Sequence, residues 1–436
     1  MSTEKDLQQK IESRTAKCAI IGLGYVGLPL AVELVSTGFT VYGIDKSAAK
    51  VEAVNRGESY IPDVPGEEVQ AGVKAGKLMA TTDFGVISGC DVVSICVPTP
   101  LNKTRDPDIS YIISALEEGI VPHVHPGMLV VLESTTYPGT TEEVVVPAAT
   151  GNGLVVGSDV FVAFSPERVD PGNPTFQTGN IPKVVGGMSE ACTRIATLFY
   201  RSFLEKVHPV SSAAVAEMVK IHENTFRSVN IGLVNELALM CDRLEIDVWE
   251  VIEGANTKPF GFMPFYPGPG LGGHCIPIDP YYLSWKARSV GFEARFIELA
   301  GQINSFMPLH VVEKASEALN SVSKALRGAK ILILGVAYKK NIDDERESPA
   351  IDVIDRLLKK GAEVTYLDPH IPELDVGTKV LKRAQNSVEL LRGADLAIII
   401  TDHDAFDYEQ ILKEAPLILD TRNAIKSRGN KKVWGI

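Results

Sequence analysis

The sequence lacks any long uninterrupted stretch of apolar residues. No run approaches the roughly 18 to 20 residues that a helix needs to cross a bilayer. The beginning of the chain, MSTEKDLQQKIESRTAK, is polar and carries both signs of charge, unlike a signal peptide or a membrane anchor. We therefore expect no membrane association and a cytoplasmic location.

Positive charge is also in short supply. The chain carries 43 lysines and arginines against 55 aspartates and glutamates, which gives a formal charge of −12. An acidic surface repels nucleic acids and anionic lipids. We expect no nucleic-acid partner, although a local group of basic residues can still bind an anion.

Cysteine is scarce. The six cysteines lie far apart, and none belongs to a CxxC pair or to a Cys/His cluster with zinc spacing, so the sequence predicts no metal site. Cys275 stands out because it follows a glycine-rich loop. The other five lie in apolar or helical contexts, where small buried residues are expected: Cys18, Cys90, Cys96, Cys192 and Cys241.

The chain does have length and apolar residues. It has 436 residues, of which 45% are hydrophobic. At roughly 100 to 200 residues per domain, this length predicts two to four domains with sizeable cores.

A strand, a helix and a second strand are predicted at residues 18–21, 28–36 and 40–44. The second strand ends in Asp45, whose carboxylate would accept hydrogen bonds from a ribose and repel a 2′-phosphate. This arrangement is typical of a dinucleotide-binding βαβ unit and favours NAD over NADP.

Three glycines follow the first strand with the spacing G-x-G-x-x-G. Gly22 permits a tight turn, Gly24 lets a pyrophosphate approach the backbone, and Gly27 lets the helix pack closely on the strand. The N-terminus of that helix attracts the phosphate charge.

Two further predicted strands, 91–97 and 128–133, end in polar loops that contain proline. The first loop holds Pro98 and Thr99, and the second holds Ser134 and Thr135. Ligands of doubly wound sheets bind outside the carboxyl ends of the strands, so we expect both loops to border the cofactor. Ordinary turns are the alternative for each loop taken alone.

A long helix is predicted over residues 211–244, which contain no proline and the single glycine Gly232. Lys220, Asn224 and Arg227 fall on one face of it. The stripe either faces solvent, as most lysines and arginines do, or lines a site.

A second α/β unit is predicted from a strand at 330–334, a helix at 349–360 and a strand at 363–367. The segment GFTVYGID is similar to GAEVTYLD, and GCDVVSICV is similar to GADLAIIIT, which indicates an internal duplication. The turn at 335–340 lacks the glycine spacing. We expect a different ligand here, with phosphates met by Lys339, Lys340 and Arg346.

The helical segment 295–326, with Pro308 inside it, lies between the two units in the sequence and is the expected connection. Such a helix often also supports dimerisation, and we expect a homodimer or higher homo-oligomer.

The glycine-rich segment PGPGLGGHCIPIDP, residues 267–280, is the most unusual part of the chain. Glycines concentrate where a backbone must fold closely around something. Cys275 and Asp279 suit a nucleophile and a proton acceptor, with a packed core cysteine as the alternative. A thiol can trap an aldehyde as a thiohemiacetal, lose a hydride to NAD and leave a thioester for hydrolysis.

Six segments together resemble the UDP-glucose/GDP-mannose dehydrogenase family. The similarity runs in order from about residue 17 to 425, and it is strongest to the branch that oxidises UDP-N-acetylhexosamines, in particular UDP-N-acetyl-D-glucosamine 6-dehydrogenases. The segments are GLGYVGLPLA, STTYPGTTEE, SPERVDPGN, AEMVKIHENTFRSVNIGLVNELA, GPGLGGHCIPIDPYYL and GVAYKKNIDDERESPA.

The resemblance implies a role for each site residue. Cys275 matches the nucleophile, Lys220 the lysine that stabilises the developing oxyanion, and Asn224 its partner. Asp279 matches a carboxylate of proton transfer or water activation, and Glu167 and Thr135 match residues that activate or position water. The implied NAD residues are Gly22, Gly24, Tyr25, Val26, Gly27, Asp45, Pro98, Thr99, Ser134 and Thr135. The implied substrate residues are Glu167, Arg168, Val169, Lys220, Asn224, Arg227, Gly272, His274, Tyr338, Lys339 and Arg346.

The segment PERVDPG departs from the PEFLAEG-like segment of UDP-glucose enzymes. Pro171 stands near the second glutamate of that pattern, and Arg168 is free to contact the sugar. This difference favours an N-acetylated substrate.

The sequence thus predicts an α/β protein with two Rossmann-like doubly wound domains joined by a helical central domain. The expected parts are a polar arm at 1–16, an NAD-binding domain at 17–210, a helical domain at 211–326 and a UDP-sugar domain at 327–436. The expected reaction is the NAD-dependent oxidation of UDP-N-acetyl-D-glucosamine at C6 to the uronic acid, for bacterial surface polysaccharides such as O-antigen lipopolysaccharide. The alternatives are UDP-N-acetyl-D-mannosamine or UDP-glucose as substrate, and a non-catalytic nucleotide-sugar binding protein.

Overall fold

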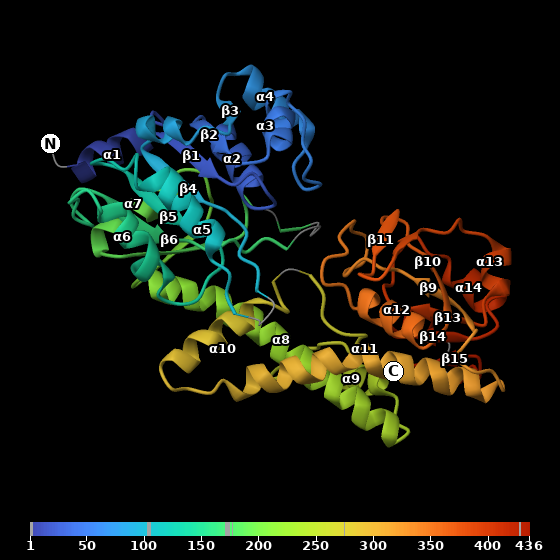
Figure 1. Ribbon diagram of the computed structural model, residues 1–436. Helices are drawn as coiled ribbons and strands as arrows, with labels where there is room; N and C mark the ends of the chain where they lie inside the picture. Colours follow the sequence, from blue (N-terminus) through green and yellow to red (C-terminus); the bar gives the residue numbers. More distant parts are fainter. Residues whose placement is uncertain (1–2, 103–105, 171–174, 177, 274, 427–428) are drawn as a thin grey trace. The chain divides into compact units, whose positions relative to one another are not determined.

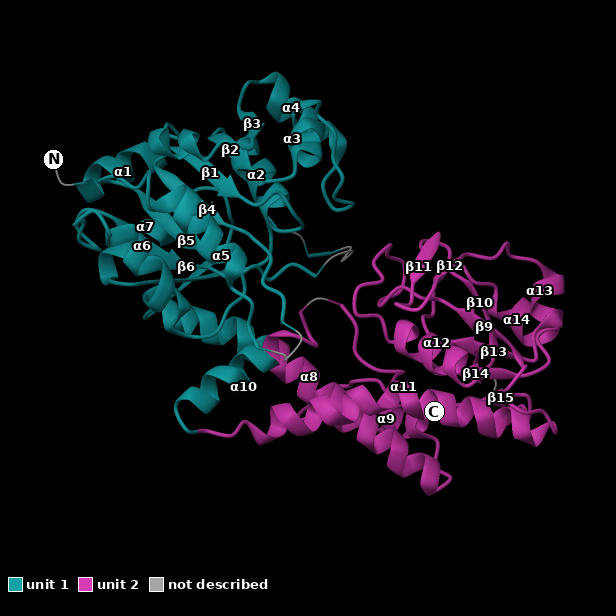
Figure 2. Cartoon of the chain, viewed as in Figure 1, with its two compact units in different colours: residues 1–223, 281–291 teal, residues 224–280, 292–436 magenta. Residues whose placement is uncertain are grey.

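The computed structural model describes residues 3–102, 106–170, 175–176, 178–273, 275–426 and 429–436 (Figure 1). The chain divides into two compact units (Figure 2). Unit 1 comprises Met1–Glu223 and Tyr281–Gly291, and unit 2 comprises Asn224–Pro280 and Phe292–Ile436. The helices α8 (Ala213–Arg243) and α10 (Asp279–Ser289) each have residues in both units.

Unit 1 contains an eight-stranded sheet in the order β3-β2-β1-β4-β5-β6-β7-β8. Neighbouring strands are parallel except β6 and β7, which are antiparallel. The first six positions follow the order of a dinucleotide-binding Rossmann sheet. The strands are β1 (Lys17–Ile21), β2 (Thr40–Ile44), β3 (Leu78–Thr81), β4 (Val92–Ile95), β5 (Leu129–Leu132), β6 (Phe161–Phe164), β7 (Lys183–Gly187) and β8 (Val207–Val210).

Both faces of this sheet are covered, so its central strands are almost entirely apolar, as is typical of parallel sheets, with Ser94 of β4 as an exception. One face packs in a core with α1, α2, α3, α4 and α7, and the other packs with η1, α5, η2, η3 and α6. These helices are α1 (Thr3–Glu12), α2 (Gly27–Ser36), α3 (Ala48–Asn55), α4 (Gly66–Lys74), η1 (Phe84–Gly89), α5 (Ser110–Ala115), η2 (Leu116–Ile120), η3 (Thr141–Val145), α6 (Val146–Thr150) and α7 (Glu190–Arg201).

Unit 2 contains a five-stranded parallel sheet in the order β10-β9-β13-β14-β15. Residues of α11 and α12 fill the core on one face, and residues of α13 and α14 fill the core on the other. β11 and β12 pair with each other as a separate antiparallel hairpin. The strands are β9 (Lys330–Leu334), β10 (Glu363–Leu367), β11 (Glu373–Asp375), β12 (Val380–Lys382), β13 (Leu396–Ile399), β14 (Ile418–Asp420) and β15 (Val433–Trp434), and the helices are α12 (Pro349–Lys359), α13 (Val388–Gly393) and α14 (Tyr408–Glu414).

Helices form much of the rest of unit 2. They are the C-terminal part of α8, α9 (Val248–Asn256) and α11 (Arg295–Ser321). Gly232 of α8 lets it approach α11 closely, because a Cβ there would lie 3.0 Å from the Cβ of Ala300. Lys314 of α11 also donates to Asp242 of α8 at 2.7 Å.

The predicted fold class is confirmed, with a Rossmann-like sheet, a helical central region and a second parallel sheet. Every strand and helix predicted above is present, with ends shifted by a few residues. The residues expected as a polar arm instead form α1, whose Leu7 and Ile11 are buried against the sheet of unit 1. The domain boundaries at 210 and 326 stay predictions. Among the described helices, none combines the length and apolarity needed to cross a membrane.

Candidate active site

The turn between β1 and α2 contains three glycines, and two of them, Gly22 and Gly27, cannot be replaced without movement of the backbone. Gly22 has φ +95°, and a Cβ there would lie 2.5 Å from the Cys96 carbonyl oxygen. A Cβ on Gly27 would lie 1.8 Å from the Gly22 carbonyl oxygen. A Cβ on Gly24 would meet nothing within 4 Å, so this backbone is open to a ligand. The turn therefore fits a pyrophosphate.

Asp45 follows β2 and supports the same turn. Its Oδ2 accepts from the Leu23 N–H at 2.9 Å, and its Oδ1 accepts from the Ser47 N–H at 2.9 Å. Val26 precedes α2 and has no polar side chain with which to cap it, so the helix N-terminus is left for an anion. Tyr25 beside it is exposed. These residues fit NAD.

The two polar loops lie at the carboxyl ends of β4 and β5, as predicted. Ser134 is buried, and its hydroxyl donates to the Val97 carbonyl at 2.7 Å, which joins the two loops. Thr99 is buried, Pro98 is exposed and Thr135 is partly buried.

Glu217 of α8 supports the C-terminal end of the loop after β5. Its buried carboxylate accepts from the N–H groups of Gly139 at 2.6 Å and Thr141 at 2.8 Å, and from the Thr141 hydroxyl at 2.7 Å. Burial raises the pKa of Glu217, against the effect of these hydrogen bonds. Glu217 therefore ties the loop that carries Thr135 to the helix that carries Lys220.

Glu167 follows β6 and accepts three hydrogen bonds within unit 1. Its Oε1 accepts from the N–H groups of Arg168 at 2.7 Å and Val169 at 2.8 Å. Its Oε2 lies 3.0 Å from Lys183 Nζ, which also lies 2.7 Å from Glu133 Oε2. Lys183 and Glu133 were not among the residues predicted from the sequence.

Arg168 was expected to contact the sugar, but its guanidinium is engaged within unit 1. It forms a two-point ion pair with Glu223, with an NH2–Oε1 distance of 2.5 Å, and donates to the Pro182 carbonyl. A sugar contact would require Arg168 to leave or share these partners.

In unit 2, three of the predicted catalytic residues are connected. Asn224 Nδ2 donates to Asp279 Oδ2 at 2.5 Å, and both residues are buried. The Asp279 N–H donates to the Cys275 carbonyl at 2.8 Å, at the start of α10. Cys275 is exposed, whereas the other five cysteines are buried, as the sequence predicted. An exposed thiol four residues before a hydrogen-bonded carboxylate suits nucleophilic chemistry.

The glycine-rich loop packs on the predicted substrate residues of unit 2. A Cβ on Gly272 would lie 2.6 Å from the Tyr338 Cβ, and one on Gly273 would lie 2.7 Å from the Tyr338 ring. The Gly273 N–H donates to the Arg346 carbonyl at 3.0 Å. Arg346 itself pairs with Asp344, with an NH2–Oδ2 distance of 2.6 Å. The structure thus brings Gly272, Tyr338 and Arg346 together.

A buried pair of residues, Asp368 and His403, supports the loop after β9, which carries Tyr338. His403 Nε2 lies 3.0 Å from Asp368 Oδ2, and the same oxygen accepts from the N–H groups of Val336 and Ala337. Since His403 Nδ1 accepts from the Asn341 N–H at 2.9 Å, the ring proton lies on Nε2. Burial acts to raise the pKa of Asp368, but its hydrogen bonds outweigh burial and hold the pKa well below its usual value.

Three further predicted residues lie on α8 and in the loop after β9. Lys220 is buried and Arg227 is exposed, both on α8, and Lys339 is partly buried in the loop after β9. His274 lies outside the described residues.

Four residues that support the site were missed, namely Glu133, Lys183, Glu217 and His403. The first two carried a signal, because each is a charged residue at the end of a short apolar strand, where burial forces it to find a partner. Glu217 and His403 gave no such signal, since their partners are distant in the sequence.

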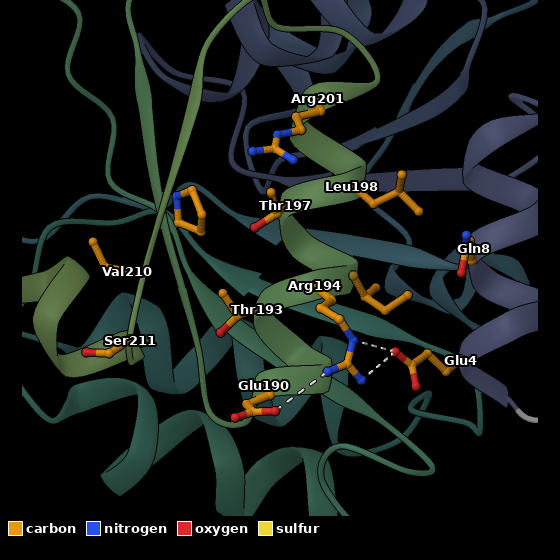
Figure 3. Close-up of a pocket in the computed structure, with 12 residues that line it drawn as sticks. Glu4, Gln8, Glu190, Thr193, Arg194, Thr197, Leu198, Arg201, Val210 and Ser211 are labelled. Carbon is orange, nitrogen blue, oxygen red and sulfur yellow. Dashed lines mark hydrogen bonds and ion pairs between the residues drawn. The ribbon is translucent and has the colours of Figure 1, made fainter.

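A surface hollow of about 650 Å³ lies between α1, α7 and β8 (Figure 3). None of the predicted site residues lines it. Arg194 projects across it and is engaged by Glu4 and Glu190 (Figure 3). No group of three or more His, Cys, Asp or Glu side chains in the described part of the chain is arranged to hold a metal ion.

Comparisons with known proteins agree with this geometry. The chain matches three models of the UDP-glucose/GDP-mannose dehydrogenase family: the NAD binding domain over residues 16–204, the central domain over 214–305 and the UDP binding domain over 332–427. The model for the NAD binding domain assigns NAD as the cofactor.

Similar proteins cover almost the whole chain. A UDP-N-acetyl-D-mannosamine dehydrogenase of Methanococcus maripaludis is 34% identical over 430 residues, 95% of each chain. A UDP-N-acetyl-D-glucosamine 6-dehydrogenase of Pseudomonas aeruginosa is 36% identical over 361 residues, 82% of this chain and 84% of the relative. The solved structure of a UDP-D-ManNAc dehydrogenase from Pyrococcus horikoshii has a TM-score of 0.87 at 34% identity, with 96% of this chain and 99% of that chain covered. The chain therefore belongs to the UDP-glucose/GDP-mannose dehydrogenase family, and it is an NAD-dependent nucleotide-sugar dehydrogenase.

Proposed function

We propose that this dehydrogenase oxidises the C6 hydroxyl of a UDP-N-acetylhexosamine to the carboxylate, a four-electron oxidation that uses two NAD molecules. The observation that carries the proposal is the exposed Cys275, whose carbonyl accepts from the N–H of Asp279, the residue that forms the buried hydrogen bond with Asn224. A chain that holds both a dinucleotide turn and a reactive thiol can retain the aldehyde covalently between the two oxidations.

Cys275 has the central role in this proposal. Its sulfur bonds to the aldehyde carbon to give a thiohemiacetal, loss of a hydride gives a thioester, and water then releases the uronic acid. NAD accepts one hydride in each oxidation. A thiolate forms near neutral pH when a cation is close, and Lys220 is the cation proposed for this role.

The other catalytic residues have proposed roles that follow the family resemblance. Lys220 stabilises the developing oxyanion, with Asn224 one helical turn away on α8. Asp279 moves the proton, a role that suits a carboxylate held by an amide donor. Glu167 acts as the base in thioester hydrolysis, and Thr135 positions the hydrolytic water.

The NAD site proposed for unit 1 consists of the glycine turn and the loops after β2, β4 and β5. The backbone of the turn and the start of α2 would hold the pyrophosphate, and Asp45 would accept from the ribose. The proposed contacts are Gly22, Gly24, Tyr25, Val26, Gly27, Asp45, Pro98, Thr99, Ser134 and Thr135.

The UDP-sugar contacts proposed for unit 2 lie around the glycine-rich loop and the loop after β9. The cations of this loop would meet the phosphates, because no glycine-rich helix start is present there. The proposed contacts are Asn224, Arg227, Gly272, His274, Tyr338, Lys339 and Arg346, together with Glu167, Arg168, Val169 and Lys220 of unit 1.

Two epimeric substrates are candidates. The PERVDPG segment favours an N-acetylated substrate without deciding between the epimers. The family resemblance favours UDP-N-acetyl-D-glucosamine, and the Pseudomonas relative is named for that substrate. Other relatives, including those of Methanococcus and Salmonella typhi, are named UDP-N-acetyl-D-mannosamine dehydrogenases, which makes that epimer the second candidate.

We extend the proposal to the assembly and the setting of the enzyme. Phe226, Leu233 and Met240 of α8 are exposed and recur every seven residues, so they form an apolar row along one face. Such a row supports self-association as a homodimer or higher homo-oligomer. We place the enzyme in the cytoplasm, in the synthesis of a surface polysaccharide such as O-antigen.

The deciding experiment measures NADH production by the purified protein with UDP-N-acetyl-D-glucosamine, UDP-N-acetyl-D-mannosamine and UDP-glucose. We expect two NADH per sugar and the highest kcat/KM with UDP-N-acetyl-D-glucosamine. Faster turnover of UDP-glucose would reject the N-acetylated class. No NADH with any of the three, with sugar binding retained, would favour a non-catalytic nucleotide-sugar binding protein.

Cys275→Ser is the matched variant for this experiment. We expect it to bind the UDP-sugar as the wild type does but to lose complete turnover, because no thioester can form. Two NADH per sugar at the wild-type rate in this variant would contradict the role of Cys275.

A further inference from the structure

Lys183 is a buried cation held between two carboxylates of unit 1. Its side chain is 6% exposed, and its Nζ lies 2.7 Å from Glu133 Oε2 and 3.0 Å from Glu167 Oε2. The Tyr200 hydroxyl donates to Glu133 Oε1 at 2.6 Å, and Lys183 Nζ lies 5.5 Å from the centroid of the Tyr200 ring. Glu133 and Tyr200 therefore fix Lys183, and Lys183 contacts Glu167.

The strand pairing of unit 1 creates this contact. β7 runs antiparallel to β6, with Phe164 opposite Gly186. Extending this register past the end of β6 brings Lys183, the first residue of β7, opposite Glu167. Glu133 directly follows β5, the parallel neighbour of β6. The single antiparallel pair of this sheet thus delivers a cation to the carboxyl ends of β5 and β6.

Glu167 has few ways left to take part in a reaction. Its Oε1 accepts two backbone N–H groups, and its Oε2 accepts Lys183. Because a carboxylate oxygen has two lone-pair positions, Oε2 keeps one for a further donor. Such a carboxylate can orient a water molecule.

The lowered pKa of Glu167 also favours a role in orienting water. Burial acts to raise its pKa, but the Lys183 ammonium and the two backbone N–H groups outweigh burial, and the pKa lies below its usual value. A general base works best when its pKa lies near the working pH. Glu167 is thus a weak proton acceptor and a strong hydrogen-bond acceptor.

We propose that Lys183 is a positioning residue for thioester hydrolysis, in which it holds Glu167 ionised and leaves one lone pair of Oε2 to orient the attacking water. Glu133 and Tyr200 hold Lys183 in place. The inference rests on the proposed function. It changes the role of Glu167 from a base that takes the proton of the water to an acceptor that orients it.

The step is a hydrolysis in which no electrons are transferred to a cofactor. The water oxygen bonds to the thioester carbon, the C–S bond breaks, and Cys275 leaves as the thiolate. The products are the sugar carboxylate and the thiolate, and the two protons of the water are released to solvent.

Stability alone does not account for the Lys183 cluster. Apolar residues of similar volume often stabilise a protein as well as a buried ion pair does, or better, because ions lose their hydration when buried. Three ionisable groups and a tyrosine hydroxyl in one buried cluster are therefore a poor choice for packing, and they suit a carboxylate that must stay charged.

The test compares wild type with Lys183→Met/Glu133→Gln. Lys183→Met alone leaves two buried carboxylates without a cation, so the second change removes one charge and keeps an acceptor for Tyr200. We expect the double variant to produce the initial two NADH per site at a rate within about twofold of wild type. Its steady-state kcat should then fall at least tenfold, and the UDP-sugar thioester on Cys275 should accumulate in the intact mass spectrum.

Two controls separate positioning from folding. Glu133→Gln alone keeps Lys183 and its contact with Glu167 but weakens the hold on Lys183, so it should accumulate less thioester than the double variant. Lys10→Met removes a partly exposed ion pair with Asp91 elsewhere in unit 1 and should accumulate none. If the double variant slows the NADH burst and the steady state equally, with no adduct, the positioning role is rejected. If wild type makes no NADH with any UDP-sugar, the proposed function itself fails.

Discussion

The first turn of the unit 1 sheet and the first turn of the unit 2 sheet have the same construction. Gly22 follows β1 with φ +95°, and Gly335 follows β9 with φ +79°. A Cβ on Gly22 would lie 2.5 Å from the carbonyl oxygen of Cys96, and one on Gly335 would lie 2.2 Å from that of Thr401. In both units a glycine is required because the backbone that follows a neighbouring strand lies against the turn.

An aspartate supports the turn in both units. Asp45 follows β2 and accepts from the Leu23 N–H, and Asp368 follows β10 and accepts from the N–H groups of Val336 and Ala337. The two aspartates differ in the exposure of their side chains. Asp45 keeps a side-chain exposure of 13%, whereas Asp368 is fully buried with His403.

The two units diverge directly after the turn. In unit 1, α2 begins at Gly27, so the backbone of a helix start directly follows the turn. In unit 2, α12 does not begin until Pro349, and the intervening loop carries Tyr338, Lys339 and Arg346. The difference supports the proposal that one duplicated turn serves two anions, one bound by backbone N–H groups and one by cationic side chains.

Asp368→Asn should give the largest effect on this comparison. An asparagine presents an NH2 group to N–H donors that now share a carboxylate, and it removes the charge that faces His403. Hydrogen bonds to charged groups contribute about 1.5 to 3 kcal/mol each, and Asp368 accepts several of them. We expect hydrogen exchange to accelerate in β9, β10 and β13 by 100-fold or more and to stay unchanged in β1, β2 and β4.

Asp45→Asn is the matched variant in unit 1. Since Asp45 is partly exposed, we expect its loss to cost about 1 kcal/mol, a typical value for one hydrogen bond. Equal destabilisation by both variants would show that the two aspartates support their turns equally, and the comparison would fail.

The duplicated turn was readable from the sequence because it depends on local features. Gly22, Gly24 and Gly27 have a spacing set by one turn and one helix start, and Asp45 lies at the end of the next strand. The similarity of GFTVYGID and GAEVTYLD revealed the second copy. The alternation of apolar strands with helical segments was sufficient for the predicted elements of both sheets, because each element carries its own pattern.

The supporting residues were not readable, because their partners come from distant strands. Lys183 contacts Glu133 because β7 runs antiparallel to β6. The residue pattern of neither strand predicts whether the two strands pair in parallel or antiparallel. His403 contacts Asp368 because β13 and β10 both lie next to β9 in the sheet, and each residue lies in the loop that follows its strand. The first residues were read as a polar arm, although Leu7 and Ile11 are four residues apart and both are buried on α1.

Gly27→Val should have the next largest effect and should act on one ligand only. A Cβ at this position would lie 1.8 Å from the Gly22 carbonyl oxygen, so α2 must move away from the turn that holds the pyrophosphate. We expect NAD affinity to fall on the order of 100-fold, about 2.7 kcal/mol. Titration calorimetry with NAD and with UDP would measure both sites, and we expect UDP binding to be unchanged. An equal loss of UDP affinity would mean that the two turns do not act independently.

Asp45→Ala should have a smaller effect on the same ligand. The side chain would lose its contact with the ribose, and hydrogen bonds to charged groups contribute about 1.5 to 3 kcal/mol each. We expect NAD affinity to fall by roughly tenfold, because water replaces part of the lost contact at this partly exposed position. An unchanged Kd for NAD would remove Asp45 from the cofactor site.

The pH dependence of stability should give the smallest effect. Because the pKa of Asp368 is lower in the folded protein than in the unfolded chain, the unfolded chain takes up a proton first as the pH falls toward the ordinary value of about 3.9. The stabilisation by the ionised carboxylate is thus complete at neutral pH and shrinks in acid. We expect the difference in unfolding free energy between wild type and Asp368→Asn to decrease by less than about 1 kcal/mol from pH 7 to pH 4. Tyr366→Phe removes a hydroxyl that donates to Ile371 in the same loop and does not titrate in acid, so its difference from wild type should stay constant. A gap for Asp368→Asn that widens in acid would contradict the carboxylate's role as the charged support of the second turn.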